Sequence, residues 1–211
     1  MSKFQIRSFR REEISSTSKR TGSEEAFIQS FCNESPLDVE IGCGVGWHPI
    51  QYAKANPSRY LIAIEHTKTK FEKFYRRFQH HAELNNLLPV HADATRWLPQ
   101  YLRESSVSNF FILYPNPEPK ASSKRWIRMP FMGFLLRCLK QDGQLTIVTN
   151  EKAYCEEVLS FADNAWKMRL IHYREINLSS EPHFMPRTHF EKKYFNSGQT
   201  CYEVVLSPGK I

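Results

Sequence analysis

The stretch Leu37-Asp38-Val39-Glu40-Ile41-Gly42-Cys43-Gly44-Val45-Gly46 decides the fold of this chain. Residues 37–41 predict a β-strand that the first glycine ends, and residues 47–55 predict a helix directly after the last glycine. Glycine allows positive φ angles and lets a ligand approach the backbone closely, so Gly42, Gly44 and Gly46 are candidate binding residues. A strand, a glycine-rich turn and a helix in this order are typical of a nucleotide-binding α/β fold.

Predicted strands and helices continue to alternate after this unit. The further strands are expected at 60–64, 89–92, 109–114, 144–149, 168–173 and 200–206, and the further helices at 68–83, 125–139 and 151–164. Pro130 is expected to kink the second of these helices. The last two strands have no helical pattern between them, which predicts an antiparallel edge hairpin with a long loop over 175–199. We therefore expect an α/β fold with a mostly parallel seven-stranded sheet covered on both faces.

The length of 211 residues suits one domain better than two. We predict a basic N-terminal extension over residues 1–30, containing Arg7, Arg10 and Arg11, and a single domain over 31–211. A short helix is expected at 24–31. The sequence has no apolar run of about 18 residues, which a transmembrane helix would need, and its start lacks the continuous apolar segment of a signal peptide. A cytoplasmic protein without membrane contact is expected.

The cysteine and histidine patterns predict neither disulfides nor a metal site. The five cysteines are an odd number and include no CxxC pair. The eight histidines show no spacing typical of metal ligands. We expect thiols in a reducing compartment and histidines that lie on the surface or form hydrogen bonds.

Carboxylates at the ends of three successive predicted strands indicate which cofactor the turn binds. Glu40 stands beside the turn, Glu65 follows the second strand and Asp93 follows the third. A dinucleotide site would need a glycine at the position of Trp47, and its pyrophosphate would be repelled by Glu40. The ammonium and sulfonium charges of S-adenosylmethionine suit Glu40, its ribose hydroxyls suit Glu65, and its adenine amino group suits Asp93. The residues therefore favour S-adenosylmethionine over a dinucleotide.

The loop after the fourth predicted strand is the candidate substrate loop. It runs Tyr114-Pro115-Asn116-Pro117-Glu118-Pro119-Lys120, and its three prolines restrict φ. A stiff loop can hold Asn116 and Lys120 in fixed directions toward a substrate. A rigid connector without chemistry would show the same prolines, so this pattern alone leaves both interpretations open.

These motifs together resemble the bacterial tRNA (guanine-N7)-methyltransferases, which are class I S-adenosylmethionine-dependent enzymes. The resemblance runs from Ile6 to about Leu206. The motifs that carry it are Ile6-Arg7-Ser8-Phe9, the turn from Glu40 to Gly46, Ile64-Glu65, Asp93-Ala94, the Pro-x-Pro-x-x-Lys loop ending at Lys120, and Arg187-Thr188-His189-Phe190-Glu191. The proline loop and the Thr-x-x-Glu segment are far more specific than the glycine turn. The chain has asparagine at Asn116 and Asn150, where the family usually has aspartate, and Glu118 where it has an aromatic residue.

The resemblance implies methyl transfer from S-adenosylmethionine to N7 of a guanine in the tRNA variable loop, with S-adenosylhomocysteine as product. It implies a catalytic role for Asn116 and cofactor contacts from Glu40, Gly42, Gly44, Gly46, Glu65, Asp93 and Asn116. It implies substrate contacts from Lys120, Asn150, Thr188, His189, Phe190 and Glu191. The fold it implies is the class I methyltransferase fold with its antiparallel edge hairpin, in a monomer or a homodimer.

Two alternatives remain at this point. Asn116 between prolines partly matches the Asn-Pro-Pro-aromatic loop of amino-group methyltransferases, which would make N6- or N4-methylated bases. The two asparagines are also compatible with a catalytically weak, RNA-binding member of the family. In the N7 interpretation, Glu118 or Glu191 supplies the negative charge that Asn116 lacks.

The net charge of +7 favours a polyanionic partner, since lysine and arginine release the counterions of nucleic acids. The preferred RNA contacts are the basic residues after the proline loop, namely Lys120, Lys124, Arg125 and Arg128. Arg7, Arg10 and Arg11 are expected to form an arm along RNA phosphates. The basic residues of the helix at 68–83 are expected to be mainly a solvated face.

Overall fold

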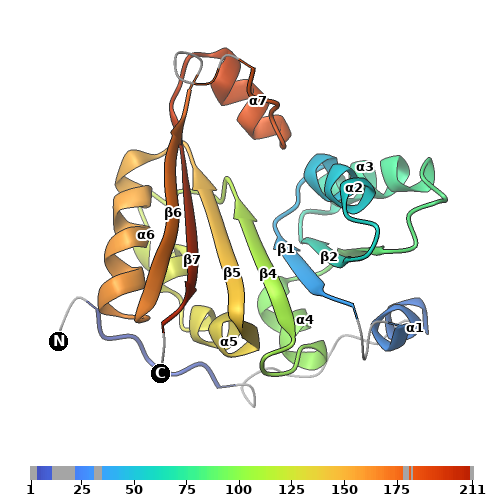
Figure 1. Ribbon diagram of the computed structural model, residues 1–211, viewed down its shortest axis with the longest axis horizontal. Helices are drawn as coiled ribbons and strands as arrows, with labels where there is room; N and C mark the ends of the chain where they lie inside the picture. Colours follow the sequence, from blue (N-terminus) through green and yellow to red (C-terminus); the bar gives the residue numbers. More distant parts are fainter. Residues whose placement is uncertain (1–3, 11–21, 31–34, 178–180, 182, 210–211) are drawn as a thin grey trace.

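The computed structural model describes residues 4–10, 22–30, 35–177, 181 and 183–209, which form one seven-stranded sheet flanked by helices (Figure 1). The order of the strands in the sheet is β3-β2-β1-β4-β5-β7-β6. Their bounds are β1 Leu37–Ile41, β2 Tyr60–Glu65, β3 Leu87–His91, β4 Val107–Leu113, β5 Leu139–Thr149, β6 Met168–Ile176 and β7 Cys201–Pro208. The helices are α1 Gly22–Ser30, α2 Trp47–Ala55, α3 Lys68–Gln79, α4 Ala94–Tyr101, α5 Phe131–Cys138, α6 Lys152–Asn164 and α7 His189–Asn196.

Strands β1 to β5 run parallel, and β7 pairs antiparallel with both β5 and β6. This confirms the expected fold class, including the antiparallel edge hairpin. The chain proceeds from β1 outward to β3, then crosses back to β4 on the other side of β1. The strand order therefore reverses between β1 and β4, and ligands of open α/β sheets bind at the carboxyl ends of strands at such a point.

Alternating side chains of β2 bury both faces of the sheet. Leu61 and Ala63 pack with α2 and α3 in one hydrophobic cluster. Ile62 and Ile64 belong to a larger cluster on the other face, with residues of α4, α5 and α6. A strand buried on both faces needs apolar residues at every position, which explains the continuous apolar run of β2.

The segment around Pro130 differs from the expected kinked helix. Two short 3₁₀ turns, Ser122–Lys124 and Trp126–Arg128, precede α5, which begins only after Pro130. Proline has no N–H and clashes with a preceding helical turn, so it begins the helix instead of bending it. Strand β5 begins at Leu139, five positions before the predicted start, and the predicted turn at Asp142-Gly143 lies inside it.

Two helices were not predicted from the sequence. Helix α4 follows Asp93, whose side chain caps it, and α7 lies inside the expected long loop over 175–199. Each has only eight residues, which is too short for a clear helical pattern. Helix α7 stands at the end of the sheet above the ends of β4 and β5, across from α2 and α3 (Figure 1). The remaining differences are boundaries: α3 ends at Gln79, β3 begins at Leu87 and β6 extends to Ile176.

The described part of the N-terminal extension packs on the domain. The ring of Phe4 lies 5.1 Å from that of Phe161, and the ring of Phe9 lies 5.2 Å from that of Phe131. Arg11, the polar run over 15–18 and Cys32 lie outside the described residues. Among the helices that the structure describes, none combines the length and apolar character needed to cross a membrane. In the same ranges, no group of three histidine, cysteine or acidic side chains could hold a metal ion.

Candidate cofactor and substrate site

The glycine turn lies at the point where the strand order reverses. Gly42, Gly44 and Gly46 have φ angles of 77°, 62° and 80°, in the left-handed region that side chains disfavour. A Cβ atom at Gly46 would lie 1.9 Å from the ring of Phe74, so this glycine is required by packing. A Cβ atom at Gly42 or Gly44 would meet no described atom within 4 Å. Packing therefore explains Gly46, whereas the first two glycines border open space.

Glu65 ties the end of β2 to this turn. Its Oε2 accepts a hydrogen bond of 2.9 Å from the N–H of Gly44, and its Oε1 accepts one of 2.7 Å from the N–H of Thr67. The side chain is only 4% exposed. Each carboxylate oxygen has a second lone pair, so Glu65 can accept further hydrogen bonds from a ligand hydroxyl. These two backbone bonds fix the direction in which it does so.

Glu40 is buried at the end of β1 beside a histidine. Its Oε2 lies 2.8 Å from Nδ1 of His48, and the two side chains are 2% and 9% exposed. His48 is one of the histidines expected to lie on the surface or to form hydrogen bonds, and it does the latter. Nearby, burial and the charges of Glu40 and Glu65 raise the pKa of the Cys43 thiol well above its ordinary value. Cys43 therefore stays a neutral thiol between the two carboxylates.

Two hollows flank the turn and share Gly42. One, of about 140 Å³, is bordered by Glu40, Gly44 and the start of α7. The other, of about 300 Å³, is bordered by Asp93 together with the apolar side chains of Trp126 and Met129. The two hollows therefore offer a polar surface at Glu40 and an apolar surface at Trp126 and Met129, on either side of Gly42.

Asp93, at the rim of the larger hollow, also caps helix α4. Its Oδ1 accepts hydrogen bonds from the N–H and the hydroxyl of Thr95, at 2.8 and 2.7 Å. These bonds cap α4, which the sequence prediction missed although Asp-x-Thr is a common start of a helix. The side chain remains exposed and its Oδ2 lies 4.0 Å from Arg96. Asp93 can therefore serve the helix and a ligand together.

Polar groups within the loop after β4 form hydrogen bonds with one another. The amide nitrogen of Asn116 donates a 2.9 Å hydrogen bond to Oε1 of Glu118, and Oδ1 of Asn116 accepts one of 3.3 Å from the N–H of Glu118. Tyr114 and Glu118 have φ angles of 52° and 46°, which is strained for residues with side chains. Arg125 donates a 2.7 Å hydrogen bond to the carbonyl of Pro117. Arg125 thus anchors the middle of the loop.

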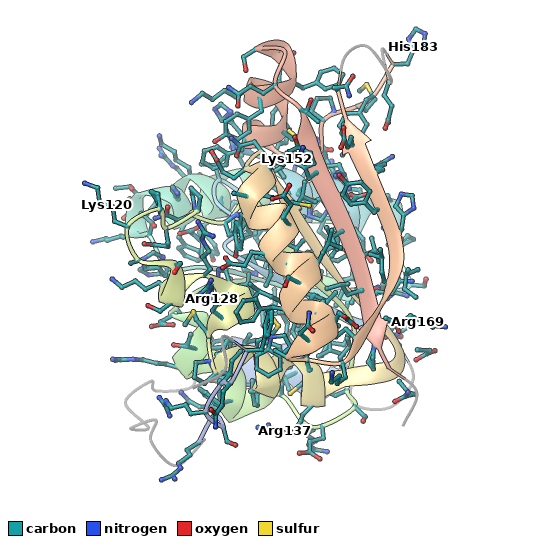
Figure 2. All side chains as sticks on the ribbon, turned by 90° about the vertical axis from the view of Figure 1, so that its left-hand side faces the viewer. Lys120, Arg128, Arg137, Lys152, Arg169 and His183 are labelled. Carbon is teal, nitrogen blue, oxygen red and sulfur yellow. The ribbon has the colours of Figure 1, made fainter. Side chains whose placement is uncertain are left out.

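The residues predicted after this loop divide into two groups. Lys120 is exposed and projects outward from the loop (Figure 2). Arg125 and Arg128 both pair with Glu157, and their guanidinium groups lie over the rings of Tyr154 and Phe161. These two arginines therefore hold the 3₁₀ turns to α6, whereas Lys120 faces solvent.

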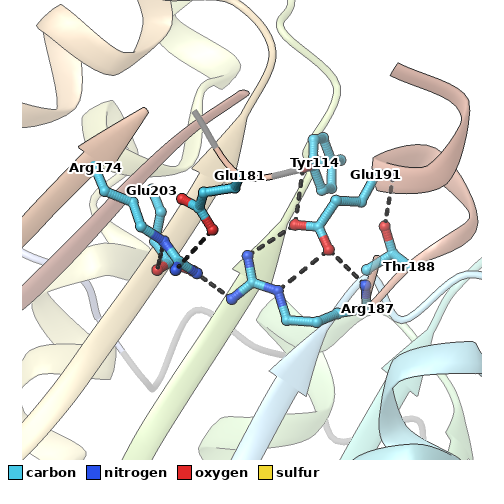
Figure 3. A network of polar contacts seen from close by, with 7 residues as sticks. All are labelled: Tyr114, Arg174, Glu181, Arg187, Thr188, Glu191 and Glu203. Carbon is cyan, nitrogen blue, oxygen red and sulfur yellow. Dashed lines mark hydrogen bonds and ion pairs between the residues drawn. The ribbon is translucent and has the colours of Figure 1, made fainter. Parts of the chain in front are cut away.

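The segment from Arg187 to Glu191 turns its acid inward. Glu191 is fully buried, and Arg187 donates to both its oxygens, at 3.2 Å from Nε and 2.7 Å from Nη2. Arg187 also pairs with Glu203 of β7 (Figure 3). The hydroxyl of Tyr114 donates a 3.0 Å hydrogen bond to Oε1 of Glu191. Burial and the charge of Glu191 raise the pKa of Tyr114 well above its ordinary value, so this hydroxyl remains a donor.

This network extends across the edge hairpin. Arg174 of β6 forms ion pairs with Glu203 at 3.1 Å and with Glu181 at 3.5 Å (Figure 3). Burial alone lowers the pKa of Arg187, but the hydrogen bonds and charges of Glu191 and Glu203 raise it above its ordinary value. Arg187 therefore keeps its positive charge, which compensates the desolvated carboxylates. The sequence prediction gave neither Arg187 nor Tyr114 this role, because the network joins the end of β4, helix α7 and strand β7, which are distant in the chain.

The structure brings together some of the predicted site residues and leaves others apart. The residues bordering the smaller hollow include Glu40, Gly42, Gly44, Thr188, His189 and Phe190. Asp93 borders the larger hollow. Of the described residues that were predicted, those bordering neither hollow are Gly46, Glu65, Asn116, Lys120, Asn150 and Glu191. The amide nitrogen of Asn150 lies 3.3 Å from Glu151 and 3.4 Å from Gln199, at the end of β5.

Comparisons with known proteins agree with this architecture. The family model described as "Putative methyltransferase" matches residues 34–204. The tRNA (guanine-N(7)-)-methyltransferase of Buchnera aphidicola subsp. Schizaphis graminum is 30% identical over 188 residues, which are 85% of this chain and 75% of that protein. The enzyme of the same name from Rubrobacter xylanophilus is 24% identical over 178 residues, 83% of this chain and 78% of that protein.

Solved structures share the fold at low sequence identity. The 16S rRNA methyltransferase KamB superposes with a TM-score of 0.66 at 16% identity, over 92% of this chain and 96% of that one. An antibiotic-related methyltransferase superposes with a TM-score of 0.63 at 17% identity, over 90% of this chain and 95% of that one. The fold, the family match and the relatives confirm the resemblance, and the chain belongs to the S-adenosylmethionine-dependent tRNA (guanine-N7)-methyltransferase family.

Proposed function

We propose that this protein transfers the methyl group of S-adenosylmethionine to N7 of a guanine in the variable loop of tRNA. One observation carries the proposal: Thr188, His189 and Phe190 border the same hollow as Glu40 and Gly44. The segment that most specifically marks the family therefore lies at the open glycine turn. The relatives named as tRNA (guanine-N(7)-)-methyltransferases support guanine N7 as the acceptor.

The proposed cofactor site uses the predicted acids in three places. Glu65 accepts the ribose hydroxyls from its fixed position under the turn. Asp93 meets the adenine amino group, and Glu40 lies near the charged methionine end. The backbone at Gly42 and Gly44 lets the cofactor pass close to the chain. Bound there, S-adenosylmethionine would supply an activated methyl group.

The reaction needs positioning more than proton transfer. Guanine N7 has a lone pair and no proton, so it can attack the methyl carbon without a general base. Holding the two reacting atoms in line lowers the barrier by up to about 7–11 kcal/mol in well-oriented systems. The loop anchored at Tyr114 and Pro117 directs the Asn116 amide, and the exposed Lys120 lies on the path of the RNA.

The methylated guanine carries a positive charge, which a nearby carboxylate stabilises. Glu191 is already neutralised by Arg187 and turned inward, which favours Glu118 over Glu191 for this role. Because Glu118 accepts a hydrogen bond from Asn116, the two side chains form one unit. Asn116 orients the base and Glu118 supplies the negative charge that an aspartate at position 116 would supply.

The test is incubation of unmodified tRNA transcripts with the protein and S-adenosylmethionine, followed by mass spectrometry of the nucleosides. We expect 7-methylguanosine in the variable loop. An N6- or N4-methylated base would instead indicate an amino-group methyltransferase. The absence of any methylated nucleoside across several tRNAs would overturn the proposed activity and favour an RNA-binding protein of weak catalysis.

The Glu118→Gln variant tests the proposed source of negative charge. We expect kcat to fall by about tenfold or more, since a charge-stabilising group typically contributes more than 1 kcal/mol. The KM for S-adenosylmethionine should stay unchanged. Glu104→Gln is the matched control, because Glu104 is an exposed carboxylate that precedes the start of β4, at the opposite end of that strand. An unchanged kcat in Glu118→Gln would exclude this role, and a gain in Asn116→Asp would indicate that Asn116 limits activity.

A further inference from the structure

A larger groove opens beside the two hollows of the candidate cofactor site. It has a volume of about 680 Å³ and lies where α2, the end of α3 and α7 meet. Val45, Trp47 and His189 border both this groove and the 140 Å³ hollow next to Glu40. The two spaces are therefore neighbours on either side of Trp47 and His189, whose ring centroids lie 6.3 Å apart.

Most of the residues that line the groove are basic, and none of the described lining residues carries a carboxylate. Its cations are Lys54, Arg77 and Lys192, and its imidazoles belong to His80, His81 and His189. These side chains come from α2, α7 and the end of α3 with the two residues that follow it, which only the fold brings together. Such a surface attracts an anion, because its cations are not balanced within its own walls.

An acid beside the groove is Glu83, whose carboxylate lies 3.8 Å from Lys54 and 3.4 Å from His81. This side chain is 61% exposed, so its charge is screened by water and offsets the lysine only weakly. Arg77 is held in place, since Nη1 donates a 2.6 Å hydrogen bond to the carbonyl of Val45 in the glycine turn. A guanidinium fixed in this way loses little further entropy when it binds an anion.

The groove also offers an aromatic surface. Trp47 is partly exposed, and Nζ of Lys192 lies 5.5 Å from the centre of its ring. Single-stranded nucleic acids are commonly held by an aromatic side chain under a base and cations along the backbone. The volume exceeds that of a lone phosphate and lies within the range of pockets for small organic ligands. Cations, an aromatic ring and this size together match one nucleotide unit.

We propose that this groove binds a nucleotide of the RNA strand next to the target guanosine, with its phosphates on Lys54, Arg77 and Lys192 and its base against Trp47. The proposal rests on the proposed function and adds the path by which the RNA strand reaches the site. The strand enters over α2, α3 and α7 and passes Trp47 and His189 into the methyl-transfer hollow. Arg77 of α3 thus belongs to a binding surface, although the basic run of α3 was expected to be mainly solvated.

The test compares two double variants that each remove two positive charges. Lys54→Gln with Lys192→Gln alters the groove. Arg137→Gln with Arg169→Gln is the matched control, because neither arginine borders the groove or the two hollows, and both lie lower than Lys120 in Figure 2. Arg137 pairs with an exposed acid at 3.7 Å, much as Lys54 does at 3.8 Å. Binding of a tRNA transcript is measured by fluorescence anisotropy from low to physiological salt, and binding of S-adenosylhomocysteine is measured by calorimetry.

We expect the groove variant to bind tRNA at least tenfold more weakly at low salt, while its affinity for S-adenosylhomocysteine stays unchanged. The slope of log affinity against log salt should fall by about 1.4, since each lost phosphate contact on a single strand removes about 0.7. The control variant should lose less than threefold. Equal losses in the two variants would overturn the groove as a specific site, as would wild-type affinity in the groove variant.

The outcomes separate this inference from the proposed function. Wild-type protein that binds tRNA but makes no 7-methylguanosine would overturn the proposed function, and the variants would still decide the groove. Wild-type protein that methylates tRNA, with a groove variant of equal affinity and rate, would overturn the groove alone. Tight binding of free guanosine monophosphate that the groove variant abolishes, without any loss of tRNA affinity, would show a mononucleotide site and contradict the RNA path.

Discussion

The glycine turn over Gly42–Gly46 and the segment Arg187–Glu191 both carry motifs typical of the family, but the structure uses them differently. The turn presents backbone to open space, since Gly42 and Gly44 border the two hollows. The segment presents His189 and Phe190 to the smaller hollow but buries its acid completely. A motif that marks a family therefore does not tell which of its side chains face the ligand.

The physical difference lies in the groups that need partners, which are backbone N–H groups in the turn and a buried charge in the segment. The turn is held by hydrogen bonds to the end of β2, such as the N–H of Gly42 donating to the carbonyl of Ile64 at 2.8 Å. Glu191 needs a cation from Arg187 and a hydroxyl from Tyr114, 77 residues away. A buried carboxylate is stable only when it is paired, so these partners decide its direction. Helix α7 is thereby coupled to the loop that carries Asn116.

The largest expected effect is at Gly46. In Gly46→Ala the new Cβ would clash with Phe74 at 1.9 Å, so we expect the free energy of unfolding to fall by about 2–4 kcal/mol, from overpacking and the positive φ. Gly44→Ala should lose only about 1 kcal/mol but bind S-adenosylhomocysteine at least tenfold more weakly. Urea denaturation measures the stability of each variant, and calorimetry measures its affinity for S-adenosylhomocysteine. A larger loss of stability in Gly44→Ala than in Gly46→Ala would contradict this division of roles.

The next effect is at Glu191. We expect Glu191→Gln to lower the free energy of unfolding by about 2–3 kcal/mol, because it removes a buried carboxylate that accepts from a charged group. Glu181→Gln, which removes a half-buried partner of Arg174 at 3.5 Å, should lose less than about 1 kcal/mol. If Glu191→Gln unfolds like the wild type but raises the KM for tRNA, then Glu191 contacts the substrate directly.

The smallest effect is at Tyr114. Tyr114→Phe keeps the ring contact with Tyr194 at 5.6 Å and removes the hydroxyl that donates to Glu191 and contacts Cys201, at a cost of about 1 kcal/mol. Because Asn116 follows two residues later, we expect a lower kcat with an unchanged KM for S-adenosylmethionine. Steady-state kinetics and urea denaturation provide the measurements. A raised KM for S-adenosylmethionine at unchanged kcat would show that Tyr114 supports the cofactor site instead of the loop.

The success of the sequence prediction depended on how local each feature was. The strands from β1 to β4 and the turn could be predicted, because apolar runs and glycines act through neighbouring residues. Helix α7 was missed although Thr188-x-x-Glu191 is a local start signal, in which the Thr188 hydroxyl accepts from the N–H of Glu191 at 2.9 Å. Its place depends on the packing of Phe195 against Cys201 and Ile176. Arg125 and Arg128 were predicted as RNA contacts, but Glu157 of a later helix holds them.

The sequence by itself determined the succession of the seven strands along the chain, the left-handed glycine turn, and the three acids at successive strand ends. These follow from local backbone preferences and from the rule that parallel strands end at one edge. Only the tertiary structure decided which acids remain available to a ligand. Glu191 is turned inward by Arg187, whereas Glu40 borders a hollow and Asp93 stays exposed. The reason is that burial of a charge depends on several elements at once. Arg187 is close to Glu191 in the chain, but Tyr114 and Glu203, which complete the network, are distant, and no local pattern records them.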